Sequence, residues 1–389
     1  MKKNSVEHRT LASWIGSCAP RKAVSRLVVL NLLLLAGLVQ AAETTIVVGQ
    51  SLNLGPDSDG GGLRIDAATK GYIASVNAAG GIQGKKIELV SLNDDGDPKI
   101  HARNLKNLVE KRGAIAFLNC QDDASCMVAA TVSAELQVPL VGVMSGLKTL
   151  PNADGPWIFR VRPDYEREAV MLGKQLLSMA CSRIVIVTDA PNSEPVKALR
   201  DGLARESLNV TVLQAGLSAA ATETLLKDLD KGPYHAAVMV VSLKTIEGLM
   251  DNQITARPEW PRVIASLSSN HLQTLMAGFK NHSFGFTYVV PNPEILDRPL
   301  TQEFQRTMDK YGAGHSSTFV GMEAYVNTKV LVEALNRVSR GEPKTLATAL
   351  RAMNNVDLGG FRVSFSNGHG SGSSWVDIGI RSRYGQLLR

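Results

Sequence analysis

Short apolar segments alternate with longer amphipathic ones along most of the chain, and this alternation constrains the fold more than any other feature. The apolar segments expected to form strands are residues 45–49, 86–93, 114–118, 139–143, 183–188, 210–214 and 236–241. The amphipathic segments expected to form helices are residues 64–77, 98–111, 125–136, 166–180, 194–206 and 222–231. Continuous apolar strands separated by helices of this length are typical of parallel sheets covered on both faces. We therefore predict an α/β chain with two doubly wound lobes, one formed before about residue 162 and one after.

The first 41 residues differ from the rest and predict an export signal. Arg21, Lys22 and Arg26 precede an apolar run at 27–39, and small residues follow at Ala41-Ala42. A basic start, a short apolar run and small residues at the cleavage point are typical of a secretory signal peptide. Thirteen apolar residues are too few for a membrane-spanning helix. We expect an exported, periplasmic protein with a signal peptide at 1–41; the alternative is an uncleaved N-terminal anchor.

The formal charge of +6 belongs mostly to this leader. Residues 1–41 contain six Lys or Arg and one acid, which leaves 36 of the 42 basic and 35 of the 36 acidic residues for the remaining chain. A nearly neutral body lacks the basic surface on which phosphate backbones are bound. We therefore expect no nucleic-acid partner.

Export into an oxidising compartment makes the cysteines after the leader informative. Cys120 and Cys126 are six residues apart, so we predict a disulfide between them; two buried free thiols are the alternative, and Cys181 is left over. The cysteines lack the spacing of a zinc site, and the histidines are scattered. No metal and no cofactor are expected.

Several stretches resemble a known family. The run at 78–89, Ala-Ala-Gly-Gly-Ile-Gln-Gly-Lys-Lys-Ile-Glu-Leu, followed by Asn-Asp-Asp-Gly-Asp-Pro at 93–98, is similar to the N-terminal lobe of type I periplasmic solute-binding proteins. The nearest branch is the leucine/isoleucine/valine-binding group of ABC importers. Val138-Pro139, Met144-Ser145-Gly146 and residues 359–368 resemble later parts of the same family.

The resemblance implies two Rossmann-like lobes joined by three crossover segments, near residues 162–165, 288–291 and 361–367. The N-terminal lobe would then comprise residues 44–162 and 291–361, and the C-terminal lobe residues 163–290 and 362–389. The resemblance also implies closure of the lobes over a small solute. Hydroxyl and backbone N–H groups would bind the solute's carboxylate, and an acidic side chain would pair with its ammonium group.

Ligands of open α/β sheets bind beyond the carboxyl ends of the strands. Carried over residue by residue, the family's binding loops fall on Gln121, Asp122, Asp123, Ser145 and Gly146 in one lobe and on Ser193, Ser242, Ser268 and Asn270 in the other. Asp122 and Asp123 have two open interpretations: contact with a cationic ligand group, or capping of the helix expected from Ser125.

The sequence also departs from the family pattern at these loops. Gly146 stands where leucine-type receptors have Thr, and Ser193 and Leu243 stand where they have aromatic residues. The acid expected within residues 266–270 is absent. The fold resemblance therefore holds, while most of the α-amino-acid signature is missing.

These features predict a solute receptor and not an enzyme. We expect a monomer that delivers an amino acid or related small solute to the membrane permease complex of an ABC importer. One alternative is a sensing module of the same fold that reports to a membrane kinase or another signalling partner. A remote alternative is an exported hydrolase, although the sequence has no G-x-S-x-G nucleophile motif and no obvious base for Ser145.

Overall fold

A computed structural model describes residues 45–55, 58, 60–268, 271–314, 318–338, 341–366, 370–382 and 387–388. The predicted signal peptide and Asn270 lie outside the described residues.

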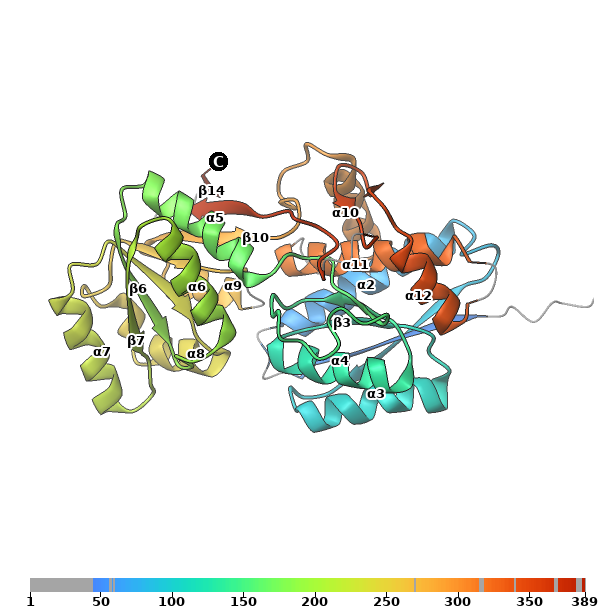
Figure 1. The fold of residues 1–389 in the computed structure, drawn as a ribbon, viewed down its shortest axis with the longest axis horizontal. Helices are drawn as coiled ribbons and strands as arrows, with labels where there is room; N and C mark the ends of the chain where they lie inside the picture. The colour runs from blue at the N-terminus through green and yellow to red at the C-terminus, as the bar shows by residue number, and fades with distance from the viewer. Residues whose placement is uncertain are drawn as a thin grey trace, which may run out of the picture. The chain divides into compact units, whose positions relative to one another are not determined.

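The first lobe contains a five-stranded parallel sheet (Figure 1). Its strand order is β2 (Ile87–Asn93), β1 (Ile46–Leu52), β3 (Phe117–Cys120), β4 (Leu140–Val143) and β5 (Ile158–Phe159). One face packs against α3 (Pro98–Arg112) and α4 (Asp123–Leu136). The other face packs against α2 (Gly61–Ala78), α10 (Pro299–Tyr311), α11 (Phe319–Leu335) and α12 (Pro343–Arg351). The last three helices come from the C-terminal part of the chain, so this lobe is discontinuous in sequence.

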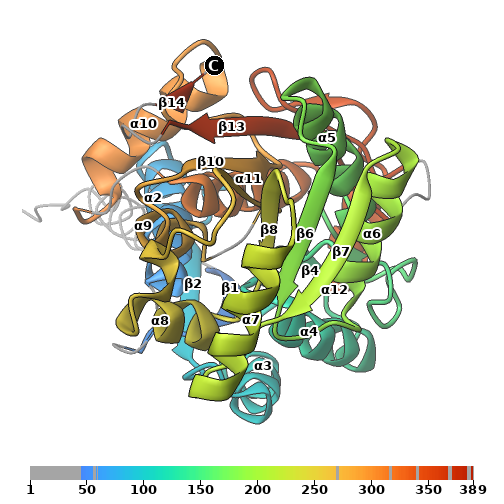
Figure 2. The ribbon, with the colours of Figure 1, turned by 90° about the vertical axis from the view of Figure 1, so that its left-hand side faces the viewer.

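The second lobe contains a seven-stranded sheet and faces the viewer in Figure 2. Its strand order is β14 (Leu387–Leu388), β13 (Asp377–Arg381), β10 (Ser283–Tyr288), β9 (Val263–Ser266), β8 (Ala236–Val240), β6 (Arg183–Thr188) and β7 (Asn209–Gln214). β10 pairs antiparallel with β13, and β13 antiparallel with β14, while the remaining pairs are parallel.

Helices cover both faces of this second sheet. α5 (Tyr165–Ser178) and α6 (Glu194–Arg205) pack on one face. α7 (Ala219–Lys231), α8 (Leu243–Asp251) and α9 (Leu272–Gly278) pack on the other, and a 3-10 turn, η1 (Ile254–Ala256), follows α8. The predicted fold of two doubly wound α/β lobes is therefore confirmed.

Local sequence signals fix where the helices of the site begin. Asp97 caps α3 through its side chain and Pro98 occupies the first helical position, where its missing N–H costs nothing. Asp164 accepts a hydrogen bond from the Arg167 N–H and so caps α5. Each cap places its helix N-terminus directly beyond a strand or a crossing segment.

Three segments connect the two lobes. The first runs from β5 to α5 and the second from β10 to α10. The third follows the hairpin of β11 (Val356–Asp357) and β12 (Arg362–Val363) and leads to β13. Val363 and Phe365 belong to the core of the first lobe, so this crossing begins after Phe365, later than the predicted lobe boundary between residues 361 and 362.

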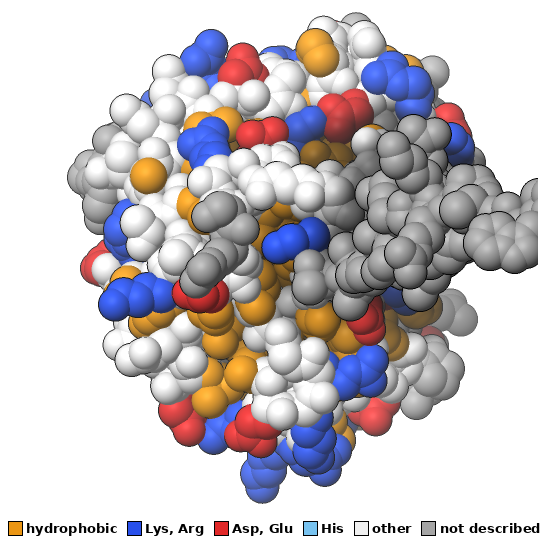
Figure 3. Space-filling view, turned by 90° about the vertical axis from the view of Figure 1, so that its right-hand side faces the viewer, with side chains coloured by type: hydrophobic (Ala, Val, Ile, Leu, Met, Phe, Trp, Pro, Cys, Tyr) orange, Lys and Arg blue, Asp and Glu red, His pale blue; other side chains and the backbone are white. Residues whose placement is uncertain are grey.

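The described surface has mixed charge. On the face in Figure 3, basic and acidic side chains are interspersed over the part that is not drawn in grey. Among the described residues, no helix has both the length and the apolar character needed to cross a membrane.

Candidate functional site

A partly buried hydrogen-bonded cluster joins the carboxyl end of β4 to the start of α5. The Oδ1 atom of Asp123 accepts hydrogen bonds from the Ser145 hydroxyl at 2.6 Å and from the Tyr165 hydroxyl at 2.7 Å. Ser145 is fully buried, and its oxygen also accepts from the Leu147 N–H at 3.2 Å. The cluster thus contains two groups from the first lobe and one from the second.

Gly146 allows the first crossing segment to approach this cluster. Its carbonyl oxygen accepts a hydrogen bond from the Tyr165 N–H at 3.1 Å. A Cβ atom at position 146 would lie 2.6 Å from Cδ1 of Tyr165 and 2.7 Å from its backbone nitrogen. The small residue at this position is therefore required by close packing. The structure shows this packing role for Gly146.

A second buried cluster surrounds Arg162, which is 3% exposed. Its guanidinium donates to Glu168 Oε1 at 2.7 Å and to the Ser268 hydroxyl, and it lies 3.6 Å from Glu323 Oε1. Glu168 Oε2 in turn accepts from the Ser268 N–H at 2.9 Å and from the Thr287 hydroxyl at 2.6 Å. Arg162 therefore links α5, the loop after β9 and α11.

The carboxylates of these clusters outnumber the cation. Asp123, Glu168 and Glu323 surround one guanidinium, that of Arg162, which also lies 5.9 Å from the centre of the Tyr165 ring. Burial lowers the pKa of Arg162, but the carboxylates of Glu323 and Glu168 outweigh burial and raise it overall. The guanidinium therefore stays charged.

Two of the acids, Asp123 and Glu323, have raised pKa values. Burial raises the pKa of Asp123, and the hydrogen bonds from Ser145 and Tyr165 offset only part of that rise. Burial likewise raises the pKa of Glu323, whose Oε1 atom has no hydrogen-bond partner among the described residues. A cationic or hydrogen-bond-donating group placed near these acids would be bound favourably.

Asp122 and Asp123 make different contacts, and Asp122 takes the capping role. Asp122 is the N-cap of α4 and forms a capping box with Ser125. Its Oδ1 atom accepts a hydrogen bond from the Ser125 N–H at 2.8 Å. Asp123 bonds to Ser145 and Tyr165 instead. Gln121 is buried, and its Oε1 accepts from the Asn53 N–H at 3.1 Å, so it fixes the loop after β1.

The remaining predicted site residues lie on the second lobe. Ser242 caps α8 and donates to Asp189 Oδ2 at 2.6 Å. Burial raises the pKa of Asp189, but hydrogen bonds from Ser242 and Thr245 outweigh burial and lower it overall. The Ser193 hydroxyl is buried and lacks a hydrogen-bond partner among the described residues. Among the described residues, neither Ser193 nor Ser242 forms a hydrogen bond with the Asp123 cluster. Ser268 belongs to the Arg162 cluster.

A further contact links the lobes beside these clusters. The backbone N–H groups of Lys148 and Thr149 donate to the carboxylate of Glu194 at 2.5 and 3.3 Å. The ammonium group of Lys148 forms ion pairs with Glu166 and, at 3.5 Å, with Asp164. The loop after β4 is thus held against the starts of α5 and α6.

A disulfide lies next to the candidate site. Cys120 and Cys126 are disulfide-bonded, with Cα atoms 5.0 Å apart, and Cys181 is a buried free thiol. The bridge connects the end of β3 to α4, so it encloses Asp122 and Asp123 in a short loop. No group of three or more His, Cys, Asp or Glu residues suited to a metal ion occurs within the described ranges.

The sequence interpretation missed Arg162, Tyr165, Glu168 and Glu323. A signal was present in two of these cases. Arg162 belongs to the run Arg-Val-Arg-Pro-Asp-Tyr at 160–165, which places charges within a predicted crossing segment. Glu323 is an acid in the largely apolar first half of a mostly buried helix. A buried charge on such a helix requires a partner.

Comparison with known proteins places the fold in a family. Residues 46–226 match the sequence model of the periplasmic binding protein family. A substrate-binding periplasmic protein from Ralstonia solanacearum has a similar structure with a TM-score of 0.77, 24% sequence identity and coverage of 88% of this chain and 99% of that one. No curated protein sequence matches the chain.

Other similar structures belong to proteins named for different solutes. The branched-chain amino acid transporter substrate-binding protein LivJ from Streptococcus pneumoniae, in complex with isoleucine, has a TM-score of 0.74 and 15% identity, covering 89% of this chain and 98% of that one. A fatty acid ABC transporter substrate-binding protein from Thermomonospora curvata has a TM-score of 0.71 and 14% identity, covering 88% and 91%. These similarities show the fold. Residues 46–226 thus match the model of the periplasmic binding protein family, and the fold is similar to that of type I periplasmic binding proteins, as the resemblance predicted.

Proposed function

We propose that the protein is a periplasmic receptor that binds a small amine-bearing solute between its two lobes and delivers it to an ABC importer. The observation that carries this proposal is the Asp123 cluster, in which side chains from both lobes share one carboxylate. A solute that replaced one of these hydrogen bonds would contact both lobes at once. Its binding would favour the closed arrangement through differential affinity.

The class of solute follows from the balance of charge. The acid that leucine-type receptors carry in the loop after β9 is missing, and Ser268 stands there in contact with Arg162. Asp123 and Glu323 supply acidic groups elsewhere in the same region, and both have raised pKa values because they are buried. An ammonium group placed against Asp123 would compensate this buried negative charge.

A thermal-shift screen tests the binding proposal. The panel contains aliphatic, basic and acidic amino acids, small amides, simple amines, and carboxylates without an amine. A ligand at ~1,000 times its dissociation constant stabilises the folded state by about 4 kcal/mol, which raises the Tm by several degrees. We expect amine-bearing compounds to raise the Tm in a way that depends on Asp123. Carboxylates without an amine should give no response that depends on Asp123.

Asp123→Asn provides the site-specific comparison, and Asp201→Asn, an exposed residue on α6, provides a matched control. Losing a charge-assisted hydrogen bond lowers affinity about tenfold or more. We expect that loss in Asp123→Asn and none in Asp201→Asn. A folded protein without a response to any compound, or equal affinity in both variants, contradicts the proposal.

Delivery to an importer needs a separate measurement. Uptake of the identified solute into vesicles that contain the cognate permease should depend on added receptor and saturate with it. Binding without receptor-dependent uptake would instead favour the sensing module.

A further inference from the structure

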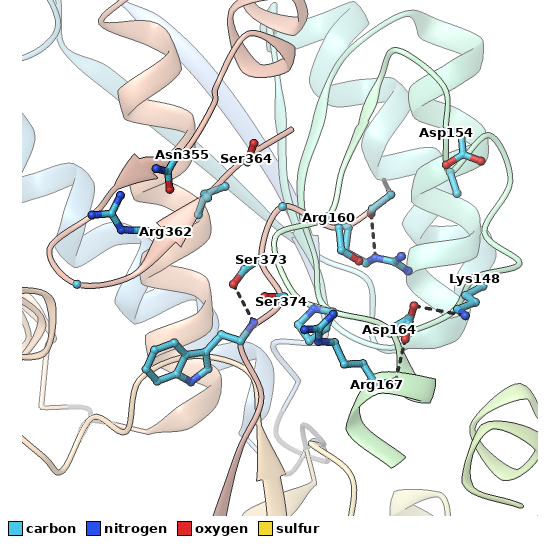
Figure 4. Close-up of a pocket in the computed structure, with 18 residues that line it drawn as sticks. Lys148, Asp154, Arg160, Asp164, Arg167, Asn355, Arg362, Ser364, Ser373 and Ser374 are labelled. Carbon is cyan, nitrogen blue, oxygen red and sulfur yellow. Dashed lines mark hydrogen bonds and ion pairs between the residues drawn. The ribbon is translucent and has the colours of Figure 1, made fainter. Parts of the chain in front are cut away.

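A large cavity lies where the first and third crossing segments run side by side, away from the Asp123 cluster (Figure 4). Its volume is about 870 Å³, within the range of small-molecule sites. The Gly372 and Ser373 N–H groups donate to the carbonyl oxygens of Arg160 and Val161, both at 2.7 Å, and so align the two segments. We call this space the crossover cavity. It does not depend on the solute site proposed above.

Arg160 gives the crossover cavity an incompletely compensated positive charge. Its side chain is 5% exposed and donates only to backbone carbonyls, that of Gly370 at 3.1 Å and that of Leu147 at 2.5 Å. Within the described chain it forms no ion pair with a carboxylate. Burial lowers its pKa, and the carboxylates of Asp164 and Glu194 offset only part of that effect.

Three more basic side chains line the same space: Lys148, Arg167 and Arg362 (Figure 4). Arg167 is exposed on the first turn of α5 and has no ion-pair partner among the described residues. Arg362 projects from β12, on the opposite side of the cavity in Figure 4, and lies 3.6 Å from Asp357. Lys148 is already paired with Asp164 and Glu166.

The other lining groups favour an anion as well. Four serines also line this space: Ser364, Ser371, Ser373 and Ser374. The N-terminal turn of α5 also borders it, and such a turn carries a partial positive charge. Of the two acids in the lining, Asp164 is paired with Lys148 and caps α5, while Asp154 is exposed.

We propose that the crossover cavity binds a small organic anion that carries carboxylate or phosphate groups. Arg160 and Arg167 on one side and Arg362 on the other provide its charged contacts, and the serine hydroxyls provide neutral ones. Because segments that join the two lobes form its walls, a bound anion holds those segments together.

Isothermal titration of the whole protein with citrate and with inorganic phosphate, at constant ionic strength, tests this proposal. The test variant is Arg167→Gln/Arg362→Gln, since both residues are exposed. The matched control is Arg103→Gln/Arg200→Gln, which removes the same charge from exposed positions on α3 and α6. Circular dichroism melts verify that each variant is folded.

At least one probe should bind, and the test variant should bind it about tenfold more weakly while the control keeps the affinity of the unmodified protein. Asp154→Asn, which removes the exposed acid, should bind it as tightly or more tightly. The proposal is overturned by the absence of binding of either probe at millimolar concentration, by equal affinity in the two double variants, or by weaker binding in Asp154→Asn.

Discussion

The hydroxyl group of Tyr165 donates a 2.7 Å hydrogen bond to the carboxylate of Asp123, and this bond ties α5 of the second lobe to α4 of the first. Burial raises the pKa of Tyr165 well above its ordinary value, so the phenol keeps its proton and acts as a donor throughout the physiological range. The contact exists because the first crossing segment ends at Tyr165 and packs directly on Gly146. Changes at either residue should therefore affect both the connection and the solute site.

Gly146→Ala should disturb this connection. The added Cβ would lie 2.6 Å from the Tyr165 ring and 2.7 Å from its backbone nitrogen, so the segment must shift. Overpacking of this kind costs ~1–3 kcal/mol, which urea unfolding would measure. Gly285→Ala is the control, because the nearest neighbour of its added Cβ would be Ala265 Cβ at 4.0 Å. Equal stability of the two variants would show that the segment yields without cost.

Arg162→Met should destabilise the protein strongly. It leaves the buried acids Glu168 and Glu323 without their cation, and breaking such a buried pair costs about 3–5 kcal/mol. Denaturant unfolding provides the measurement, with Arg103→Met on the exposed face of α3 as the control. Adding Glu168→Gln and Glu323→Gln should restore much of the loss. If it does not, packing of the Arg162 stem outweighs its charge.

Glu323→Gln should remove a pH-dependent penalty. Folding raises the pKa of Glu323, chiefly by burial, above its ordinary value of 4.5, so the folded state binds the proton more tightly than the unfolded state. Stability from this group is therefore complete below pH 4.5 and declines as the pH rises through the raised value. Relative to the unmodified protein, the variant should melt about 1–3 °C higher at pH 7, and the difference should shrink toward pH 4.

Thermal melts between pH 4 and 8 would measure this difference, with Glu247→Gln on the exposed side of α8 as the control. A variant that melts lower at pH 7 than the unmodified protein would mean that the attraction of Glu323 to Arg162 exceeds the cost of burying its charge.

Removing the disulfide should loosen the start of α4. By the loop-entropy argument, the six-residue separation of Cys120 and Cys126 gives a stabilisation of about 2 kcal/mol. Cys120→Ser/Cys126→Ser should lose that amount in denaturant unfolding, and a reductant should lower the stability of the unmodified protein but not of the variant. Solute affinity should fall too, because Asp123 lies within the bridged loop. Equal sensitivity of both proteins to reductant would point to another cause.

The elements themselves could be predicted from the sequence because their signals are local. Apolar runs at 183–188 and 236–241 and a proline after Asp97 mark strands and a helix start without any knowledge of the fold. The third crossing was placed too early because Val363 and Phe365 look like any short apolar pair, and only packing reveals which core they join.

The site was harder to predict, for a physical reason. Asp122 and Asp123 are identical neighbours. Which of them caps α4 and which one bonds to Tyr165 depends only on the residue at which the helix begins. The Arg162 cluster combines residues 162, 168, 268 and 323, which only the tertiary fold brings together. Sequence spacing carries no information about such distant partners.

The discontinuity of the first lobe has a consequence for the order in which the protein can form. Half of the cover of its sheet comes from α10, α11 and α12, which end at Arg351. During synthesis, side chains such as Ile65 and Tyr72 on α2 remain without their final neighbours until nearly nine-tenths of the chain exists. A chain built in this way cannot complete its first core before most of it has been made, so the N-terminal strands and α2 wait for the C-terminal helices during synthesis.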